Sequence, residues 1–178
     1  MILNLLIAGF GGQGVLFMGK VAASAAMLME KEVSWLPSYG PEMRGGTANC
    51  SVSIDNNPIS CPLITEPETL AVLNGPSFDK FIDAVRPGGK AFIDSSLIQK
   101  KTARTDISAY YIPAATLAEE AQLQGLGNIV MLCAIAKETH FAPMEVLEEA
   151  IRQVVPASKA HLVDANIQAL KLGYGYQE

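Results

Sequence analysis

The chain opens with Ile2-Leu-Asn-Leu-Leu-Ile-Ala-Gly-Phe-Gly-Gly-Gln-Gly14, an apolar run that leads directly into a glycine-rich stretch. The run from Ile2 to Ala8 has the length of a strand, and its nearly continuous apolarity is typical of a strand buried on both faces. From about Gly14 to Glu30 most residues are good helix formers, and Val33 to Leu36 predicts a short second strand. The sequence therefore predicts a strand, a glycine loop, a helix and a second strand at its start.

The following segment predicts a loop and a hairpin. Residues 37–46 contain two prolines and three glycines, a composition that predicts irregular structure. Thr47 to Asp55 alternates small or apolar with polar side chains and predicts a strand. Asn56-Asn57 suits a tight turn because asparagine tolerates positive φ. Pro58 to Cys61 is then predicted as a short return strand at the edge of the sheet.

The rest of the chain first alternates between strands and a helix and then becomes helical. Further strands are predicted at residues 70–73, 91–94 and 110–112, and an amphipathic helix at residues 77–85. Helices are predicted at residues 117–123, 128–139, 143–155 and 157–171, with Pro143 in a first turn and Gly173 as a helix end. The predicted fold is an α/β fold in one domain over residues 1–178: a Rossmann-like start, a mixed sheet with a hairpin and a helical C-terminal third.

The composition excludes several classes of protein. With 178 residues, 49% of them hydrophobic, the chain can fill a core and is not a disordered protein. A net charge of −5 and a pI near 5.1 argue against a nucleic-acid partner, which requires a basic face. The glycines and polar residues that break the apolar start predict neither a signal peptide nor a membrane span. Three cysteines without CxxC spacing predict a reduced, cytoplasmic protein in which cysteine alone builds no metal site.

The glycine loop is the first candidate site. Gly9, Gly11 and Gly14 form a GxGxxG pattern, with Gly12 and Gln13 inside it, between a predicted strand and a predicted helix. Such a loop lets a phosphate approach backbone N–H groups at the positive end of the helix. The alternative is that the glycines serve only close packing of helix on sheet. No acid follows the second strand to hold a ribose, and no Lys-Ser or Lys-Thr follows the loop, so neither a standard dinucleotide site nor a Walker A motif is predicted.

A second candidate lies in Ser38-Tyr-Gly-Pro-Glu-Met-Arg-Gly-Gly46, which follows the second predicted strand. Ligands of α/β sheets bind beyond the carboxyl ends of the strands, where the glycine loop is also expected. The guanidinium of Arg44 can donate two parallel hydrogen bonds to a phosphate or carboxylate. The alternative is a solvated arginine on a surface turn.

Together these motifs resemble a known family. GFGGQGV at residues 9–15 and SYGPEMRGGTANCSVSI at residues 38–54 closely resemble the gamma subunit of 2-oxoacid:ferredoxin oxidoreductases. The resemblance continues through NGPSFDKF (74–81), RPGGKAFIDSS (86–96) and MLCAIAK (131–137), and so covers nearly the whole chain. Neither of the first two motifs is specific to this family when it stands alone, but the two motifs in this order and at this spacing are specific to it.

The resemblance implies one subunit of an enzyme that oxidatively decarboxylates a 2-oxoacid, of the 2-oxoglutarate type, to an acyl-coenzyme A. In that family thiamine diphosphate is held by the alpha and beta chains, and [4Fe–4S] clusters by the beta chain and a ferredoxin-like (delta) chain, with ferredoxin as the electron acceptor. The glycine loop lies near the coenzyme A site of the fused pyruvate enzymes. The resemblance therefore implies a set of coenzyme A-binding residues in this chain, and no catalytic residue, metal or activity of its own. The set is Gly9, Gly11, Gly12, Gln13, Gly14 and Arg44.

Two other classes stay open: a self-sufficient Rossmann-type oxidoreductase with a nicotinamide or flavin, and a nucleotide-sensing regulatory module. The missing ribose acid counts against the first of these. For the isolated chain a homodimer is the default expectation.

Other polar residues are predicted to be structural. Cys50 and Cys61 are expected to face each other across the hairpin as thiols, and Cys133 to fill the core. Asp94-Ser95-Ser96 is expected to cap a helix or form a turn. His140 and His161 lack neighbours at convincing metal-ligand spacing.

Overall fold

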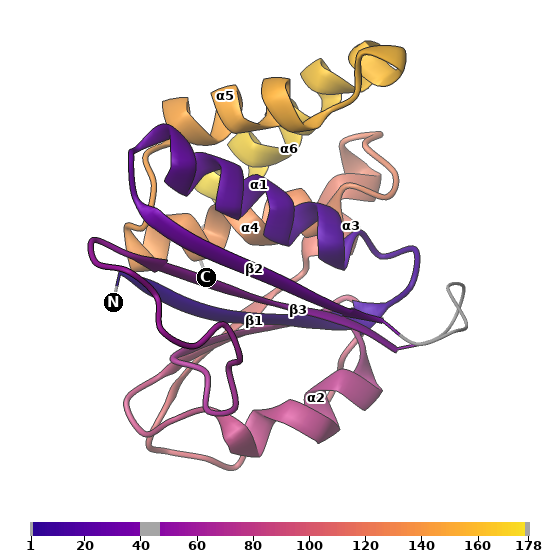
Figure 1. The fold of residues 1–178 in the computed structure, drawn as a ribbon. Helices are drawn as coiled ribbons and strands as arrows, with labels where there is room; N and C mark the ends of the chain where they lie inside the picture. Colours follow the sequence, from indigo (N-terminus) through magenta and orange to yellow (C-terminus); the bar gives the residue numbers. More distant parts are fainter. Residues whose placement is uncertain (1, 40–46, 177–178) are drawn as a thin grey trace.

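The computed structural model describes residues 2–39 and 47–176 (Figure 1). Its six strands are β1 (Leu3–Phe10), β2 (Glu32–Tyr39), β3 (Thr47–Asp55), β4 (Thr69–Val72), β5 (Lys90–Asp94) and β6 (Ser108–Ile112). Its α-helices are α1 (Val15–Leu28), α2 (Gly75–Phe81), α3 (Ala114–Glu120), α4 (Gly127–Thr139), α5 (Met144–Val154) and α6 (Val163–Gly175). Two short 3₁₀ helices, η1 (Ile82–Ala84) and η2 (Ala157–Leu162), follow α2 and precede α6.

The strands form one mixed sheet in the order β2-β3-β1-β4-β5-β6. β1, β4, β5 and β6 are parallel neighbours, whereas β3 runs antiparallel to both β1 and β2. In a doubly wound sheet of the dinucleotide-binding type, the first two strands of the chain are parallel neighbours. Here β3 lies between β1 and β2. The predicted α/β fold with a mixed sheet is confirmed.

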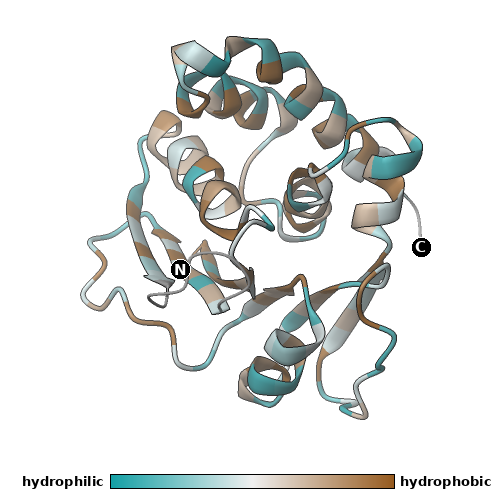
Figure 2. Cartoon of the chain, turned by 90° about the vertical axis from the view of Figure 1, so that its right-hand side faces the viewer, coloured by the Kyte–Doolittle hydropathy of each residue, from teal (hydrophilic) through white to brown (hydrophobic). Residues whose placement is uncertain are grey.

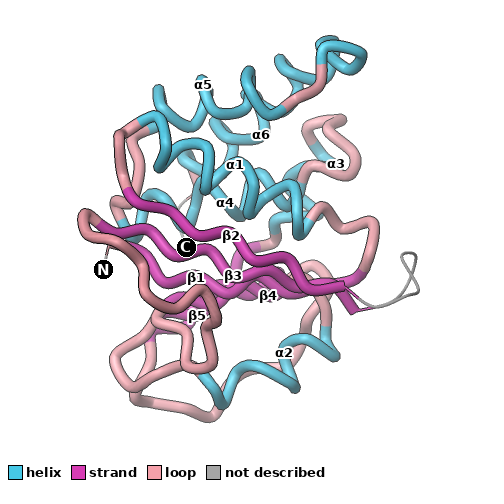
Figure 3. Tube along the Cα trace, viewed as in Figure 1, coloured by secondary structure: helices cyan, strands magenta, loops and turns pink. Residues whose placement is uncertain are grey.

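Helices cover the two faces of the sheet unequally. In Figures 1 and 3, α1, α4, α5 and α6 lie on one side and α2 lies with long loops on the other. The larger apolar cluster joins the first group of helices to the sheet, and its strand members include Leu5, Ile7 and Val52. The smaller cluster joins α2 to Leu6 and Val72 on the opposite face. Hydrophobic residues accordingly follow the strands and inner helix faces in Figure 2.

The second strand is longer than predicted. β2 continues through Pro37 to Tyr39, although this part was expected to be irregular. It is an edge strand, with β3 as its neighbour on one side, and an edge strand tolerates the missing N–H of a proline. The remainder of the predicted loop, residues 40–46, lies outside the described residues.

The predicted return strand at Pro58–Cys61 is wrong. These residues form no strand, and β3 pairs instead along its length with β1 and β2. β3 is buried over most of its length, and two long neighbouring strands satisfy its backbone hydrogen bonds. A four-residue segment that begins with proline has few backbone N–H groups to donate to a strand. Cys50 and Cys61 therefore do not face each other: Cys50 is buried and Cys61 is exposed, and both thiols are free.

The C-terminal third is helical as predicted, with two differences. The single helix expected over residues 157–171 is divided into η2 and α6. Gly173 was expected to end the last helix but lies inside α6, where an added Cβ would come within 2.2 Å of the Val130 carbonyl oxygen. This glycine therefore serves the close packing of α6 on α4. Among the described helices, none is long and apolar enough to cross a membrane.

Candidate functional site

The glycine loop joins the end of β1 to the start of α1. Gly12 (φ 101°) and Gly14 (φ 75°) both have positive φ, the conformation that favours glycine. The loop closes through a hydrogen bond from the Gln13 N–H to the Phe10 carbonyl (3.1 Å). An added Cβ at Gly12 would meet no atom within 4 Å, so the backbone there is open to an approaching ligand.

Gln13 holds the loop in place from inside. Its Oε1 accepts hydrogen bonds from the Phe10 N–H (2.7 Å) and the Asn74 side chain (3.2 Å). Its Nε2 donates to the Leu73 carbonyl at the end of β4 (2.7 Å). Gly9 makes room for this arrangement, since a Cβ there would lie 2.8 Å from the Gln13 Oε1. The structure therefore gives the Gln13 amide three partners within the protein, and leaves open space at Gly12.

Helix α1 begins without a side-chain cap. Its N-cap is Gly14, which has no side chain to accept from the first-turn N–H groups. The Gly14 carbonyl instead accepts from the Met18 N–H (2.9 Å) and from the Asn128 side chain at the start of α4 (3.1 Å). An uncapped helix start beside an open glycine loop can bind an anion.

A hollow of about 240 Å³, here called the strand-end hollow, lies beside the loop at the carboxyl ends of the parallel strands. It is lined by Gly12, Gln13, Asp94, Glu119 and Asn128, among others. Both titratable residues among its described lining, Asp94 and Glu119, are acidic, so this lining offers a phosphate no positive side chain.

Asp94, at the end of β5, is only 2% exposed. Burial raises the pKa of its carboxyl, an effect that hydrogen bonds from Ser96 and from the backbone at the start of α3 partly oppose. The Ser96 N–H donates to the Asp94 Oδ1 at 3.0 Å, and the Ser96 hydroxyl accepts from the Thr116 N–H at 3.0 Å. The sequence prediction of a turn and cap for Asp94-Ser95-Ser96 is confirmed by these contacts.

Arg44 lies outside the described residues, and its role stays a prediction. The strands on either side of its segment do reach the glycine loop. Thr47, at the start of β3, lies opposite Phe10, and Tyr39, at the end of β2, lies opposite Ala48.

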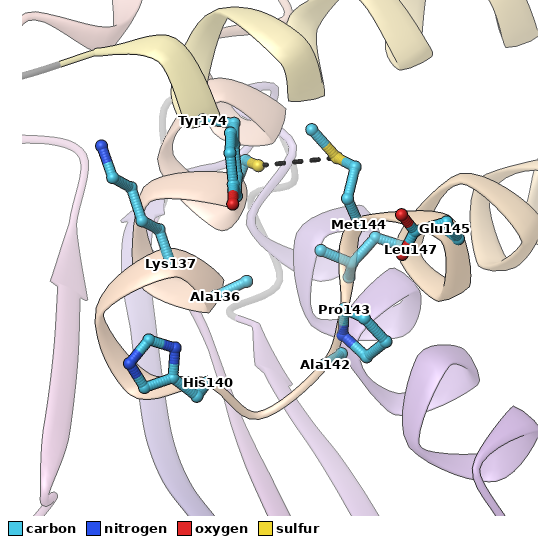
Figure 4. A pocket seen from close by; sticks show the side chains of 10 residues that line it. Ala136, Lys137, His140, Ala142, Pro143, Met144, Glu145, Leu147 and Tyr174 are labelled. Carbon is cyan, nitrogen blue, oxygen red and sulfur yellow. Dashed lines mark hydrogen bonds between the residues drawn. The ribbon is translucent and has the colours of Figure 1, made fainter.

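A separate pocket of about 410 Å³ lies at the other end of α4 (Figure 4). Lys137, His140 and Glu145 line it, but the Lys137 ammonium already donates to the Tyr176 carbonyl at 2.8 Å. Burial raises the pKa of the Cys133 thiol to about 12, which makes it unreactive, and its sulfur lies 3.9 Å from the Met144 sulfur. The 13 residues of α4 separate this pocket from the glycine loop by about 20 Å. Within residues 2–39 and 47–176, no three His, Cys, Asp or Glu side chains gather as a metal site would need.

Sequence reasoning missed the residues that support the loop from other segments. Asn74 caps α2 by accepting from the Ser77 N–H (2.8 Å) and also contacts Gln13. Asn128 contacts Gly14 from α4. The asparagine before Gly-Pro at residues 74–76 is a recognisable helix-start signal, whereas nothing local in the sequence marks the contact of Asn128.

The fold and the loop define an α/β protein with a glycine-rich loop at the start of its first helix. The family model for pyruvate ferredoxin/flavodoxin oxidoreductases matches residues 4–176. The chain belongs to this family. It is an oxidoreductase subunit of the gamma type, as the following relatives indicate.

Two curated relatives show the range of the family. The chain is 36% identical over 171 residues to the 2-oxoglutarate synthase subunit KorC of Methanocaldococcus jannaschii, an alignment that covers 94% of this chain and 90% of KorC. It is 36% identical over 170 residues to the ketoisovalerate oxidoreductase subunit VorA of Methanothermobacter thermautotrophicus, covering 94% of this chain but only 35% of VorA.

Solved structures share the fold. The gamma subunit of a keto/oxoacid ferredoxin oxidoreductase from Geobacter sulfurreducens matches with a TM-score of 0.81 and 26% identity, over 97% of this chain and 96% of that one. A chain of the 2-oxoglutarate:ferredoxin oxidoreductase from Magnetococcus marinus, solved with 2-oxoglutarate, coenzyme A and succinyl-CoA, matches with a TM-score of 0.86. Its identity is 22%, and the match covers 96% of this chain and 30% of that chain, so it shows the fold alone.

Proposed function

We propose that this chain is the gamma subunit of a 2-oxoacid:ferredoxin oxidoreductase of the 2-oxoglutarate type, and that its glycine loop forms part of the coenzyme A site. The observation that carries the proposal is the conformation of the loop, with Gly12 and Gly14 at positive φ ahead of an uncapped α1. Coenzyme A carries phosphate groups, which such a helix start favours. The Magnetococcus marinus enzyme, a chain of which shares this fold, was solved with coenzyme A bound.

The substrate and partners follow from the relatives. KorC, which this chain matches over 90% of its length, supports 2-oxoglutarate, although VorA is equally identical. The proposal places thiamine diphosphate and the [4Fe–4S] clusters in alpha, beta and ferredoxin-like partner chains, with ferredoxin as the acceptor. Arg44 is proposed as a further anion-binding residue, and a cytoplasmic location stays a prediction from the cysteine content.

Gly12→Val tests the role of the loop. A valine strongly disfavours the φ of 101° at this position, and its side chain would occupy the space open to the ligand. In the assembled complex we expect the apparent KM for coenzyme A to rise about tenfold, the loss of roughly one charge-assisted contact. The decarboxylation of the 2-oxoacid should be retained.

Gly88→Val is the matched control. Gly88 also has positive φ (78°) and open space around its Cβ position, but it lies in a turn before β5, away from the glycine loop. It should carry similar backbone strain and leave the KM unchanged. An unchanged KM in a well-folded Gly12→Val complex would reduce the loop to a packing role.

A further inference from the structure

An apolar groove lies among the helices rather than at the strand ends. This helical groove, of about 440 Å³, is bounded by α1, the start of α4, the end of α5, η2 and α6. Its lining includes the apolar side chains of Phe17, Leu126, Val155 and Leu162. Phe17 and Leu126 are half-buried, and Leu162 is 40% exposed. An occupant that covers these side chains removes apolar surface from water and gains free energy by doing so.

The 3₁₀ helix η2, which forms one wall of the helical groove, has no buried residue. All six of its residues, Ala157–Leu162, are exposed. In Figure 1 this segment projects at the upper right, between α5 and α6. A helix at the surface of a globular protein usually buries one of its sides, and η2 does not. A small molecule inside the groove would leave η2 uncovered, whereas a segment of another protein chain can cover the groove and η2 together.

The charged side chains at the groove have one sign. Lys20 from α1 and Lys159 from η2 are the two charged residues among its described lining, and both are exposed. Neither forms an ion pair with another residue in the described part of the chain. The whole chain has a net charge of −5, so this local positive charge is opposite in sign to that of the molecule. Charge complementarity therefore favours an occupant that carries carboxylates.

We infer that the helical groove and η2 form the docking surface for a segment of a partner chain, with apolar side chains in the groove and acidic side chains opposite Lys20 and Lys159. The inference rests on the proposed function, which requires partner chains, and it names the surface of this chain that one of them contacts. Gly14 also lines the groove. A segment bound there would therefore hold its chain beside the glycine loop.

The test is titration of this chain against its partner chains, with the affinity of assembly as the readout. We expect Lys20→Glu and Lys159→Glu each to weaken assembly about tenfold and to reduce its dependence on salt, because each reverses a charge that attracts the partner. Both lysines are exposed, so neither change disturbs the core. Lys171→Glu, at an exposed lysine of α6 outside the groove, is the matched control and should leave assembly unchanged.

Leu162→Asp tests the apolar part of the docking surface. Leu162 is 40% exposed in the free chain, and we expect its replacement by a charged residue to weaken assembly about tenfold. Leu63→Asp, at a leucine that is 61% exposed and lies outside the groove, controls for the loss of an exposed leucine. Normal assembly of the Lys20, Lys159 and Leu162 variants would overturn the inference.

Hydrogen exchange of the backbone identifies the occupant. We expect the amides of Ala157–Leu162 to exchange about tenfold more slowly in the complex than in the isolated chain. Equal exchange in both would overturn the inference. The same protection of the isolated chain by octanoate or coenzyme A would also overturn it, because the groove would then be a small-molecule site. A homodimer of the isolated chain that Lys159→Glu dissociates would overturn it as well, because the occupant would then be a second copy.

The failure of this inference can be told from the failure of the proposed function, because the two are read from different quantities. The groove variants change the affinity of assembly, whereas Gly12→Val changes the KM for coenzyme A in the assembled complex. Normal assembly of the groove variants, with a raised KM in Gly12→Val, would overturn only the docking surface. An unchanged KM in Gly12→Val, with weakened assembly of the groove variants, would overturn only the role of the loop.

Discussion

Asp94 is an acidic residue whose burial disfavours the charged form of its carboxyl. It lies at the end of β5, almost fully buried, and its pKa is raised mainly by that burial. A raised pKa means that the folded chain binds the proton more tightly than the unfolded chain. Stability associated with Asp94 is therefore present at low pH and is lost as the pH rises through its folded-state pKa.

Asp94→Asn makes this dependence measurable. The amide has the shape of the carboxyl and can still accept from the Ser96 N–H, but it carries no charge to bury. In urea unfolding, we expect the variant to gain stability relative to wild type as the pH rises above the ordinary range of an aspartate, because only the wild type then ionises a buried group. Asp164→Asn, at an exposed aspartate in the first turn of α6, controls for the loss of a charge. A stability difference between variant and wild type that does not change with pH would show that the folded state does not favour protonation of Asp94.

At the scale of elements, the packing of α6 on α4 depends on Gly173. A Cβ at this position would lie 2.2 Å from the Val130 carbonyl oxygen and 2.9 Å from the Cys133 Cβ. We expect Gly173→Ala to force the helices apart and to lower the free energy of unfolding by about 1–3 kcal/mol. Gly175→Ala, in the same helix with nothing within 4 Å, should change it by no more than about 1 kcal/mol, toward greater stability. Thermal or urea unfolding of both variants checks this, and equal stabilities would contradict the close approach.

The elements of this fold could be predicted where the signal is local. The apolar run of β1, the glycines after it and the alanine-rich α1 each carry a pattern that burial and backbone conformation explain. The partners of β3 could not be predicted, because periodicity shows which face of a strand is buried but not which strand lies beside it. A nearby asparagine turn therefore suggested a hairpin, although β3 lies between β1 and β2.

In the candidate site, too, some features could be predicted from the sequence and others depend on the tertiary fold. The positive φ of Gly12 and Gly14 fits the glycine pattern. The ligand-binding role predicted for Gln13 came from its place in the motif, whereas two of its three internal hydrogen bonds join it to Leu73 and Asn74, between β4 and α2. Asn128 reaches Gly14 from α4, more than a hundred residues after the loop, so only the tertiary fold brings the two residues together.

At the scale of the whole molecule, the proposed function gives this chain one part of an active centre that several chains build. The glycine loop and the strand-end hollow lie side by side, and Gly12 and Gln13 belong to both. The proposed function requires alpha, beta and ferredoxin-like chains to bring thiamine diphosphate and iron–sulfur clusters to this corner. The isolated chain is therefore expected to be colourless and catalytically silent.

Reconstitution of the complex tests the central claim most directly. The measurement is the reduction of ferredoxin that depends on 2-oxoglutarate and coenzyme A, with this chain, its partner chains, or both. We predict no turnover by this chain alone, none by the partners without it, and turnover that saturates with coenzyme A when all are mixed. Oxidation of a 2-oxoacid by this chain alone, or the same turnover and coenzyme A saturation when it is left out, would contradict the account.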